Sequence, residues 1–110
     1  MYDSIIILGP TATGKTSIAI SLAKALNTEI INADSMYIYK RLDIGTAKPN
    51  EAEMNGVVHH LIDIVEPENS FNVAEYRELA KEKLKYFKKN NLFPIIVGGT
   101  GFYIDSLIKN

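Results

Sequence analysis

Three short apolar runs predict strands that are buried on both faces. They are Ser4–Leu8, Glu29–Ala33 and Pro94–Val97, and each contains at least two consecutive isoleucines. Strands of this kind are typical of parallel sheets covered by helices on both sides. We expect the first two runs to be neighbouring strands of one sheet.

Two longer stretches carry apolar residues at helical spacing. Residues 16–26 follow the first strand, and the face expected to pack on the sheet consists of Ile18, Leu22, Ala25 and Leu26. Residues 73–89 form the second helix, with Asn72 or Ser70 as its N-cap. Its apolar face consists of Val73, Tyr76, Leu79, Ala80, Leu84 and Phe87. Strands that alternate with helices in this way predict an α/β fold with a parallel sheet.

The middle and the end of the chain are harder to interpret. Residues 35–68 are irregular, and we expect loops there with a helical turn at Ser35–Tyr39 and a strand at Leu61–Val65. A last, strongly apolar helix begins at Phe102 and has nothing to cover it. We therefore expect residues 1–110 to be the N-terminal part of a larger domain.

Composition narrows the class of protein. The chain has 110 residues, 12 Lys and Arg against 13 Asp and Glu, and no cysteine. It therefore has no general positive field for nucleic acid, no disulfide and no thiolate metal site. The pattern contains no signal peptide and no membrane span, and five lysines between Lys81 and Lys89 lie mainly on a solvated helix face. We expect a monomer in the cytoplasm that does not bind membranes.

The most specific motif follows the first strand. It matches G-x-x-x-x-G-K-[ST] and consists of Gly9, Pro10, Thr11, Ala12, Thr13, Gly14, Lys15 and Thr16. In such a loop the backbone N–H groups and the helix N-terminus bind phosphate. Lys15 supplies a charge to the terminal phosphates, and the Thr16 hydroxyl binds Mg²⁺. The motif predicts a phosphate site without naming the phosphate compound.

Asp34 is the first candidate for chemistry beyond this loop. It directly follows the second strand, and ligands bind at the carboxyl edge of open α/β sheets. Its carboxylate can act as a general base or as an outer contact of the magnesium ion. It can equally cap the helical turn that follows.

Other candidates carry weaker signals. Thr46 and Lys48 lie in a Gly- and Pro-containing loop, which is also typical of an exposed turn. His59 and His60 point to opposite faces of an extended segment and are poorly placed to share one metal ion. Tyr37 and Tyr39 can stack on a nucleotide base or pack in the core. A glycine cluster at residues 98–101 indicates close approach of a ligand or a tight turn.

Taken in order, five segments resemble the successive motifs of tRNA dimethylallyltransferases. They are Gly9–Thr16, Asn32–Met36, Asp43–Pro49, His59–Asp63 and Val97–Tyr103. The resemblance covers nearly all of this chain but about the first third of a family member. It implies a sheet like that of P-loop-containing nucleoside triphosphate hydrolases, with flanking helices. The tRNA-binding insertion and the C-terminal part of the domain would then be absent, and we expect the 110-residue chain alone to be inactive.

The resemblance also implies a reaction and its residues. The N6 amine of an adenosine in the tRNA anticodon loop attacks dimethylallyl diphosphate, and diphosphate leaves. Gly9–Thr16 would hold the diphosphate with Mg²⁺ on Thr16, and Asp34 would accept the amine proton. Asp34, Ser35, Met36, Tyr37 and Thr100 align with positions that contact tRNA.

The chain departs from the family pattern at two positions. Tyr37 stands where the family usually has Gln, so an amide expected to bind the substrate base is replaced by a phenol. Thr13 replaces a common Ser and keeps the hydroxyl. Two other functions share the loop and the aspartate: an adenylate isopentenyltransferase, and a nucleotide or metabolite kinase in which the loop binds ATP. The segment Gly45–Pro49 favours the tRNA enzymes, and the scarcity of arginine disfavours a kinase lid.

Overall fold

A computed structural model of the chain describes most of its length. The described residues are 4–8, 15–34, 37–40 and 49–98, excluding the side chains of residues 8, 15 and 16. The predicted helix after residue 102 therefore lies outside the described residues.

Four parallel strands form the sheet within the described part of the chain. They are β1 (Ile5–Leu8), β2 (Ile30–Asn32), β3 (His59–His60) and β4 (Ile95–Gly98). Their order across the sheet is β1-β4-β2-β3. The parallel sheet is thus confirmed, but the expected adjacency of the first two strands is wrong, because β4 lies between β1 and β2.

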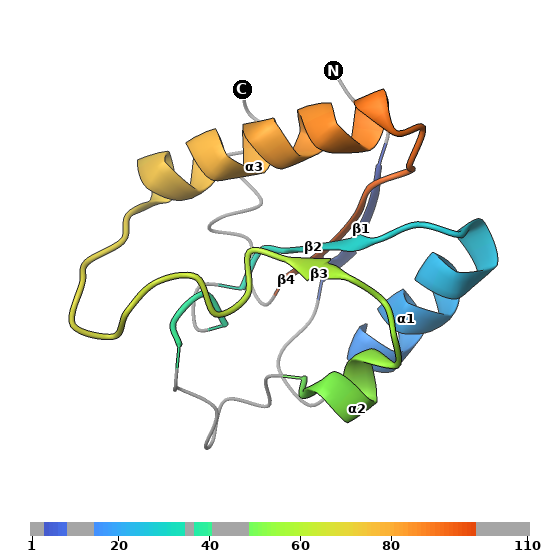
Figure 1. Ribbon diagram of the computed structural model, residues 1–110, viewed down its shortest axis with the longest axis horizontal. Coiled ribbons are helices and arrows are strands. Elements are labelled where there is room, and N and C mark those ends of the chain that lie inside the picture. Colours follow the sequence, from blue (N-terminus) through green and yellow to red (C-terminus); the bar gives the residue numbers. More distant parts are fainter. Residues whose placement is uncertain (1–3, 9–14, 35–36, 41–48, 99–110) are drawn as a thin grey trace.

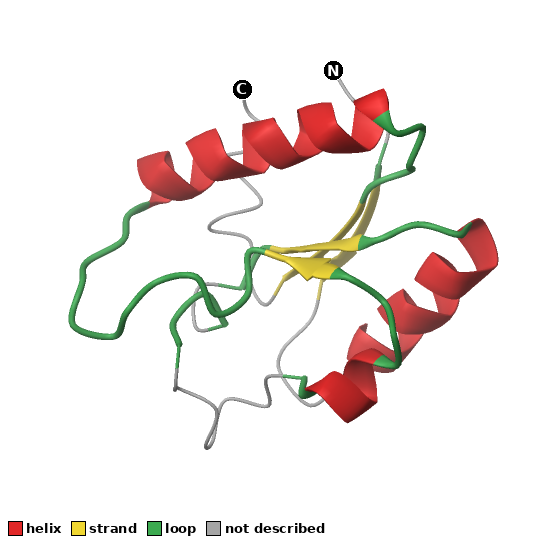
Figure 2. Ribbon diagram, viewed as in Figure 1, coloured by secondary structure: helices red, strands yellow, loops and turns green. Residues whose placement is uncertain are grey.

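Helices cover both faces of this sheet. Helix α3 (Val73–Lys89) lies on one face, and α1 (Lys15–Leu26) and the short α2 (Glu51–Met54) lie on the other (Figure 1). Figure 2 shows the same three layers, with the strands between the helices. The prediction of an α/β fold with flanking helices is confirmed.

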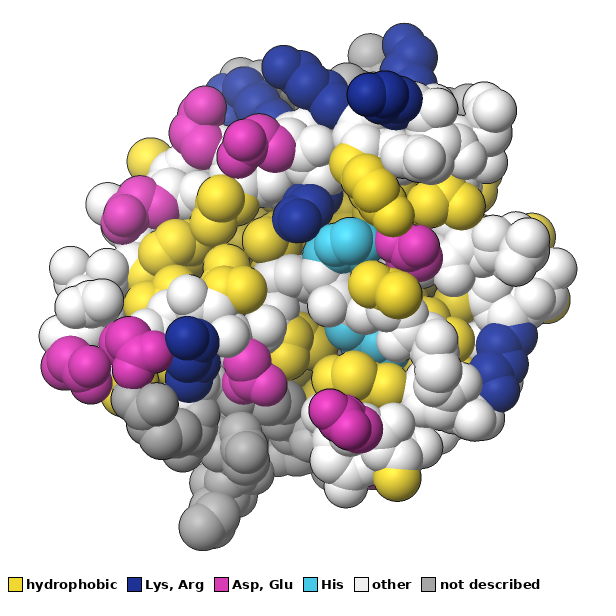
Figure 3. Space-filling view, in the orientation of Figure 1, with side chains coloured by type: hydrophobic (Ala, Val, Ile, Leu, Met, Phe, Trp, Pro, Cys, Tyr) yellow, Lys and Arg dark blue, Asp and Glu magenta, His cyan; other side chains and the backbone are white. Residues whose placement is uncertain are grey.

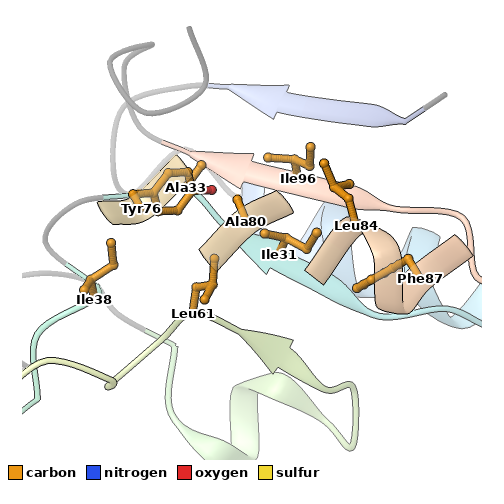
Figure 4. Packing of buried hydrophobic residues seen from close by; sticks show 9 residues of the cluster. All are labelled: Ile31, Ala33, Ile38, Leu61, Tyr76, Ala80, Leu84, Phe87 and Ile96. Atoms are coloured by element: carbon orange, nitrogen blue, oxygen red, sulfur yellow. The ribbon is translucent and has the colours of Figure 1, made fainter. Parts of the chain in front are cut away.

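The strands supply two separate cores because successive side chains point to opposite faces. Ile30 and Ile95 pack toward α1, together with Val97. Ile31 and Ile96 pack on the other side, against α3 (Figure 4). The largest buried side chains of that second core are Tyr76 and Phe87, both from α3. Burial on both faces explains why these strands are continuous apolar runs.

The predicted packing face of α1 is wrong for three of its four residues. Leu22 packs against the core, but Ile18 is 55% exposed, Leu26 is 47% exposed and Ala25 is exposed, whereas Ala19 and Ala23 are 1% exposed. Ser17, Ser21 and Lys24 form an exposed polar stripe, which limits the packing face without selecting among the apolar residues beside it. The small side chains of Ala19 and Ala23 let the helix backbone approach the sheet closely, and this packing decides the orientation.

Helix α3 agrees with its prediction from end to end. Asn72 caps it: its Oδ1 accepts from the Glu75 N–H at 2.8 Å, and Glu75 accepts in return from the Asn72 N–H at 3.0 Å. The same arrangement joins Asn50 and Glu53 at α2, a helix the sequence analysis missed. The Asn-x-x-Glu spacing of Asn50 and Glu53 could have predicted the start of this helix.

The predicted strand at Leu61–Val65 is also wrong. Leu61 has a φ of 67° and Asp63 a φ of 57°, and this left-handed backbone ends the pairing after β3. Val65 instead forms an isolated parallel bridge with Tyr39. In the predicted helical turn, the Tyr37 N–H donates to the Asp34 carbonyl at 3.2 Å, and Ser35 and Met36 lie outside the described residues.

Candidate functional site

The strand register brings the carboxyl ends of three strands to one edge of the sheet. Leu8 of β1 is paired with Gly98 of β4, and Val97 of β4 is paired with Asn32 of β2. The chain therefore leaves β1, β4 and β2 at the same level. Since neighbouring strands are about 4.8 Å apart, the ends of β1 and β2 are separated by about 10 Å. This edge brings together the segments that the sequence analysis singled out.

The phosphate-loop motif has the expected setting. Strand β1 ends at Leu8 and α1 begins at Lys15, so the motif starts directly after a strand and its last two residues begin a helix. Gly9, Pro10, Thr11, Ala12, Thr13 and Gly14 lie outside the described residues. Lys15 and Thr16 are the first two residues of α1, where backbone N–H groups lack helical partners. The N-terminus of this helix thus starts beside the edge where β1 ends.

Asp34 lies two residues beyond β2 at this edge, as predicted. Its exposed fraction is 8%, so a carboxylate is held largely away from bulk solvent. Pairing continues just past the strand, because the Ala33 N–H donates to the Val97 carbonyl at 2.7 Å. The position of Asp34 is therefore set by the sheet and not by a free loop.

Asn32 is a site residue that the sequence analysis passed over. Its side-chain amide contacts the backbone of Asp34 on both sides: Oδ1 accepts from the Asp34 N–H at 3.0 Å, and Nδ2 donates to the Asp34 carbonyl at 3.0 Å. The exposed fraction of Asn32 is 3%. The available signal was a polar side chain at the end of a buried apolar strand, since buried polar groups need partners.

Tyr37 is buried, with 4% of its surface exposed. Burial raises the pKa of its phenol, and the nearby negative charges of Asp34 and Glu53 raise it further. Its ring borders a cavity of about 20 Å³, which is room for about one water molecule. The cavity is lined by Ala19, Ile30, Asn32, Tyr37, Pro49, His59, Ile62 and Val97. Core packing of one tyrosine is thus confirmed, while a base contact by Tyr37 stays a prediction.

The side chains of His59 and His60 in β3 lie on opposite faces of the sheet, as predicted for adjacent residues of an extended segment. His59 borders the cavity on the α1 side, and its Nδ1 lies 2.9 Å from the Val57 carbonyl oxygen. Burial lowers the pKa of His59, against the opposing effect of the Val57 hydrogen bond, and neighbouring His60 lowers it further.

His60 belongs to the other face of the sheet. Its ring contacts Phe87 of α3, with ring centroids 5.4 Å apart, and its Nε2 lies 2.7 Å from Glu29 Oε1. Figure 3 shows one histidine next to an acidic side chain and the other below it, between hydrophobic side chains. In the described ranges, no group of three His, Cys, Asp or Glu side chains is arranged to hold a metal ion.

The remaining candidates are only partly described. Thr46 and Lys48, like Gly99, Thr100 and Gly101, lie outside the described residues, while Gly98 ends β4 in a buried position. Basic side chains gather along the outer side of α3 (Figure 3), where Lys85, Lys88 and Lys89 are exposed. Of the helices that the structure describes, none has the length and apolar character to span a membrane.

Comparison with protein families identifies a match over most of the chain. The model of a family described as IPP transferase matches residues 37–110. A tRNA dimethylallyltransferase from Bacillus licheniformis is 58% identical over 104 residues, which cover 94% of this chain and 33% of that protein. The enzyme of the same name from Bacillus subtilis is 55% identical over the same shares. The chain thus spans about a third of the length of the curated relatives it matches.

Solved structures give the same result for the fold. The full-length tRNA isopentenylpyrophosphate transferase from Bacillus halodurans superposes with a TM-score of 0.93 at 46% identity, over 98% of this chain and 36% of that one. A eukaryotic dimethylallyltransferase, described as acting on tRNA, has a TM-score of 0.91 at 32% identity, over 97% of this chain and 27% of its own. The described architecture is therefore a conserved part of larger proteins.

Proposed function

Because the chain belongs to the IPP transferase family, we propose that it forms the phosphate-binding part of a tRNA dimethylallyltransferase. The whole enzyme would transfer a dimethylallyl group from dimethylallyl diphosphate to N6 of an adenosine beside the tRNA anticodon. The names of the relatives from Bacillus licheniformis and Bacillus subtilis support this reaction. A cytoplasmic, monomeric enzyme remains part of the proposal.

One observation of the structure supports the proposal most directly. The buried carboxylate of Asp34 stands at the same sheet edge as the end of β1, with only β4 between them. A separation of about 10 Å between the two strand ends leaves room for a substrate between a phosphate loop and a base. The edge therefore suits a reaction in which one group leaves as a phosphate compound and another gives up a proton.

The proposed step balances as a substitution at carbon. The adenosine N6 lone pair forms a bond to the first carbon of the dimethylallyl group, and the bond from that carbon to the diphosphate oxygen breaks. The electron pair leaves with the diphosphate, which Gly9–Thr16 would stabilise through backbone N–H groups and Lys15. Asp34 would accept the proton that N6 loses.

A magnesium ion fits the chemistry of the residues at this edge. Mg²⁺ prefers oxygen ligands and binds through one or two protein groups together with substrate phosphates. Thr16, at the second position of α1, would bind the ion through its hydroxyl, and Asp34 would be an outer contact across the edge and not a ligand. When bound, the ion would neutralise charge on the departing diphosphate.

The contacts with tRNA are proposed for the same edge. Asp34, Ser35, Met36, Tyr37 and Thr100 would contact the substrate nucleotide, which must leave the stacked loop to present its N6. Asp34 and Tyr37 are the described members of this set and both are buried, so Tyr37 would act from beneath the base site. No observation favours the kinase or the free-adenylate reaction over transfer to tRNA.

The test uses a chimera in which residues 1–110 replace the matching third of the Bacillus licheniformis relative. We expect the chimera to prenylate an anticodon stem-loop, detected by the mass of the modified nucleoside. Asp34→Asn should lower kcat by about 10²- to 10⁴-fold, because a general base contributes on that scale. Binding of dimethylallyl diphosphate should stay within about twofold, because the phosphate loop is intact.

The matched control removes a carboxylate far from the edge. Glu82 is exposed on α3, and Glu82→Gln should leave kcat unchanged within about twofold. Full turnover by the Asp34→Asn chimera would rule out the base role. Turnover of ATP by the chimera, without prenyl transfer, would replace the proposal with the kinase alternative.

A further inference from the structure

The side chain of Asn32 makes three hydrogen bonds to backbone groups at the carboxyl edge of the sheet. Two go to Asp34, one to its N–H and one to its carbonyl, both at 3.0 Å. In the third, Nδ2 also donates to the Leu61 carbonyl at 2.9 Å. These three bonds fix which way round the amide of Asn32 lies. If its oxygen and its NH₂ group were exchanged, the NH₂ group would face the Asp34 N–H, and two donors would oppose each other. Both N–H groups of the Asn32 amide therefore donate to backbone carbonyls.

Asn32 also accepts a hydrogen bond from a residue of α3. The Tyr76 hydroxyl donates to the Asn32 carbonyl at 2.9 Å, and Tyr76 is fully buried. The Leu61 backbone that Asn32 contacts is in the left-handed region, with a φ of 67°. Such a conformation is costly for leucine and persists where surrounding contacts hold it. Through its side-chain amide and its backbone carbonyl, Asn32 thus connects β2 with the strained segment after β3 and with α3.

The Asp34 side chain leaves the backbone between the two groups that Asn32 binds. Because Asn32 binds both the N–H and the carbonyl of Asp34, the peptide groups on either side of its Cα cannot rotate without losing a buried hydrogen bond. A buried donor or acceptor left without a partner costs about 1–3 kcal/mol. The direction in which the carboxylate leaves the backbone is therefore restricted.

We propose that Asn32 is a positioning residue, which fixes the backbone of Asp34 so that its carboxylate reaches the substrate amine. This inference rests on the proposed function, in which Asp34 is the base. A general base must lie within hydrogen-bond reach of its proton, and a displacement of about 1 Å can cost about 10²-fold in rate. Asn32 touches no reacting atom and acts only through Asp34.

A matched control separates positioning from stability. Thr28 stands at the opposite end of β2, about 13 Å from Asn32. Its hydroxyl donates to the Phe93 carbonyl at 2.8 Å, and its exposed fraction is 8%. Thr28→Ala therefore removes a hydrogen bond from a side chain to the backbone two residues before β2 begins, away from the site edge.

The experiment measures kcat and KM in the chimera for Asn32→Ala, Asn32→Ser and Thr28→Ala, each normalised to its folded fraction. Asn32→Ala should lower kcat by about 10- to 100-fold. The KM for dimethylallyl diphosphate should stay within about twofold, because the phosphate loop is untouched. Asn32→Ser should recover part of kcat, since its hydroxyl can still accept from the Asp34 N–H. Thr28→Ala should keep kcat within about twofold.

The outcomes of this experiment distinguish the inference about Asn32 from the proposed function. Equal kcat values for Asn32→Ala and Thr28→Ala overturn the inference while leaving the proposed function intact. An inactive unsubstituted chimera, or an Asp34→Asn chimera with full activity, overturns the proposed function first. If Asn32→Ala does not fold, Asn32→Ser and Tyr76→Phe carry the test. Both must lower kcat below that of Thr28→Ala, and failure to do so overturns the inference.

Discussion

At the scale of single residues, His59 is a described group whose environment links protonation to stability just below neutral pH. Burial, the largest effect, lowers its pKa below 6.5, and the positive charge of a protonated His60 lowers it further. When the pH falls below 6.5, the unfolded chain binds a proton at this position before the folded chain does. The free energy of unfolding therefore decreases on acidification in this window, and His59 has no such effect above it.

We predict that the urea midpoint of the chain falls between pH 7.5 and pH 5.5, in part because of His59. One proton changes the slope by at most about 1.4 kcal/mol per pH unit. His59→Asn should flatten this dependence, because an amide can still donate to the Val57 carbonyl but does not titrate. The His60→Gln variant is the control, and it should keep the part of the slope that comes from the burial of His59, which is the largest effect on its pKa. An unchanged slope in His59→Asn would contradict the assignment.

Single residues also show where prediction from the sequence reaches its limit. The place of Asp34 could be predicted, because it follows directly from a strand ending at a sheet edge. The role of Asn32 could not, because its amide contacts Leu61, 29 residues away in the sequence. The cavity beside Tyr37 likewise has Pro49 and His59 in its lining, two residues that lie 12 and 22 positions further along the chain. Hydrogen bonds and cavities of this kind depend on tertiary packing that local patterns do not encode.

At the scale of elements, α1 and α3 illustrate opposite cases. Helix α3 has polar residues on one side, so its apolar face and its Asn72 cap could be predicted from spacing. Helix α1 also has an exposed polar stripe, formed by Ser17, Ser21 and Lys24, but its buried residues are Ala19, Ile20 and Ala23. Periodicity limits the packing face of α1 to its apolar part, and tertiary packing selects which apolar residues meet the sheet.

This packing of α1 predicts a contrast between two alanines. Ala23 is 1% exposed in the core beneath α1, whereas Ala25 lies on the exposed side of the same helix. Ala23→Leu should lower the free energy of unfolding by about 1–3 kcal/mol, because the core has no room for three added carbons. Ala25→Leu should change it by no more than about 0.5 kcal/mol.

Urea denaturation of both variants gives the comparison directly. Both substitutions add the same side chain to the same helix, so differences in helix propensity cancel. A larger loss of stability in Ala25→Leu than in Ala23→Leu would contradict the observed orientation and restore the face expected from the sequence.

At the scale of the whole molecule, the alternation of strands and helices predicts the parallel sheet but leaves its order open. Strand β4 is last in sequence among the described strands, yet it lies between β1 and β2. The chain passes through β3 and α3 before it forms β4, and no local pattern in the sequence specifies that β4 then pairs between β1 and β2. The consequence for the proposed site is direct, because β4 sets the spacing between the end of β1 and the end of β2, which Asp34 follows.

The last prediction concerns the 110-residue chain by itself, which we expect to show less than about one-hundredth of the chimera's prenyl transfer. The relatives from Bacillus licheniformis and Bacillus subtilis are about three times longer. The chain has a formal net charge of −1, so it provides no general attraction for a phosphate backbone, the main source of affinity for nucleic acids. The measurement compares the chain and the chimera on one anticodon stem-loop with dimethylallyl diphosphate. A cooperative urea transition must first establish that the chain is folded, so that inactivity reports missing contacts with tRNA. Turnover by the folded chain at a rate comparable with the chimera would show that the sheet edge alone is sufficient for the reaction.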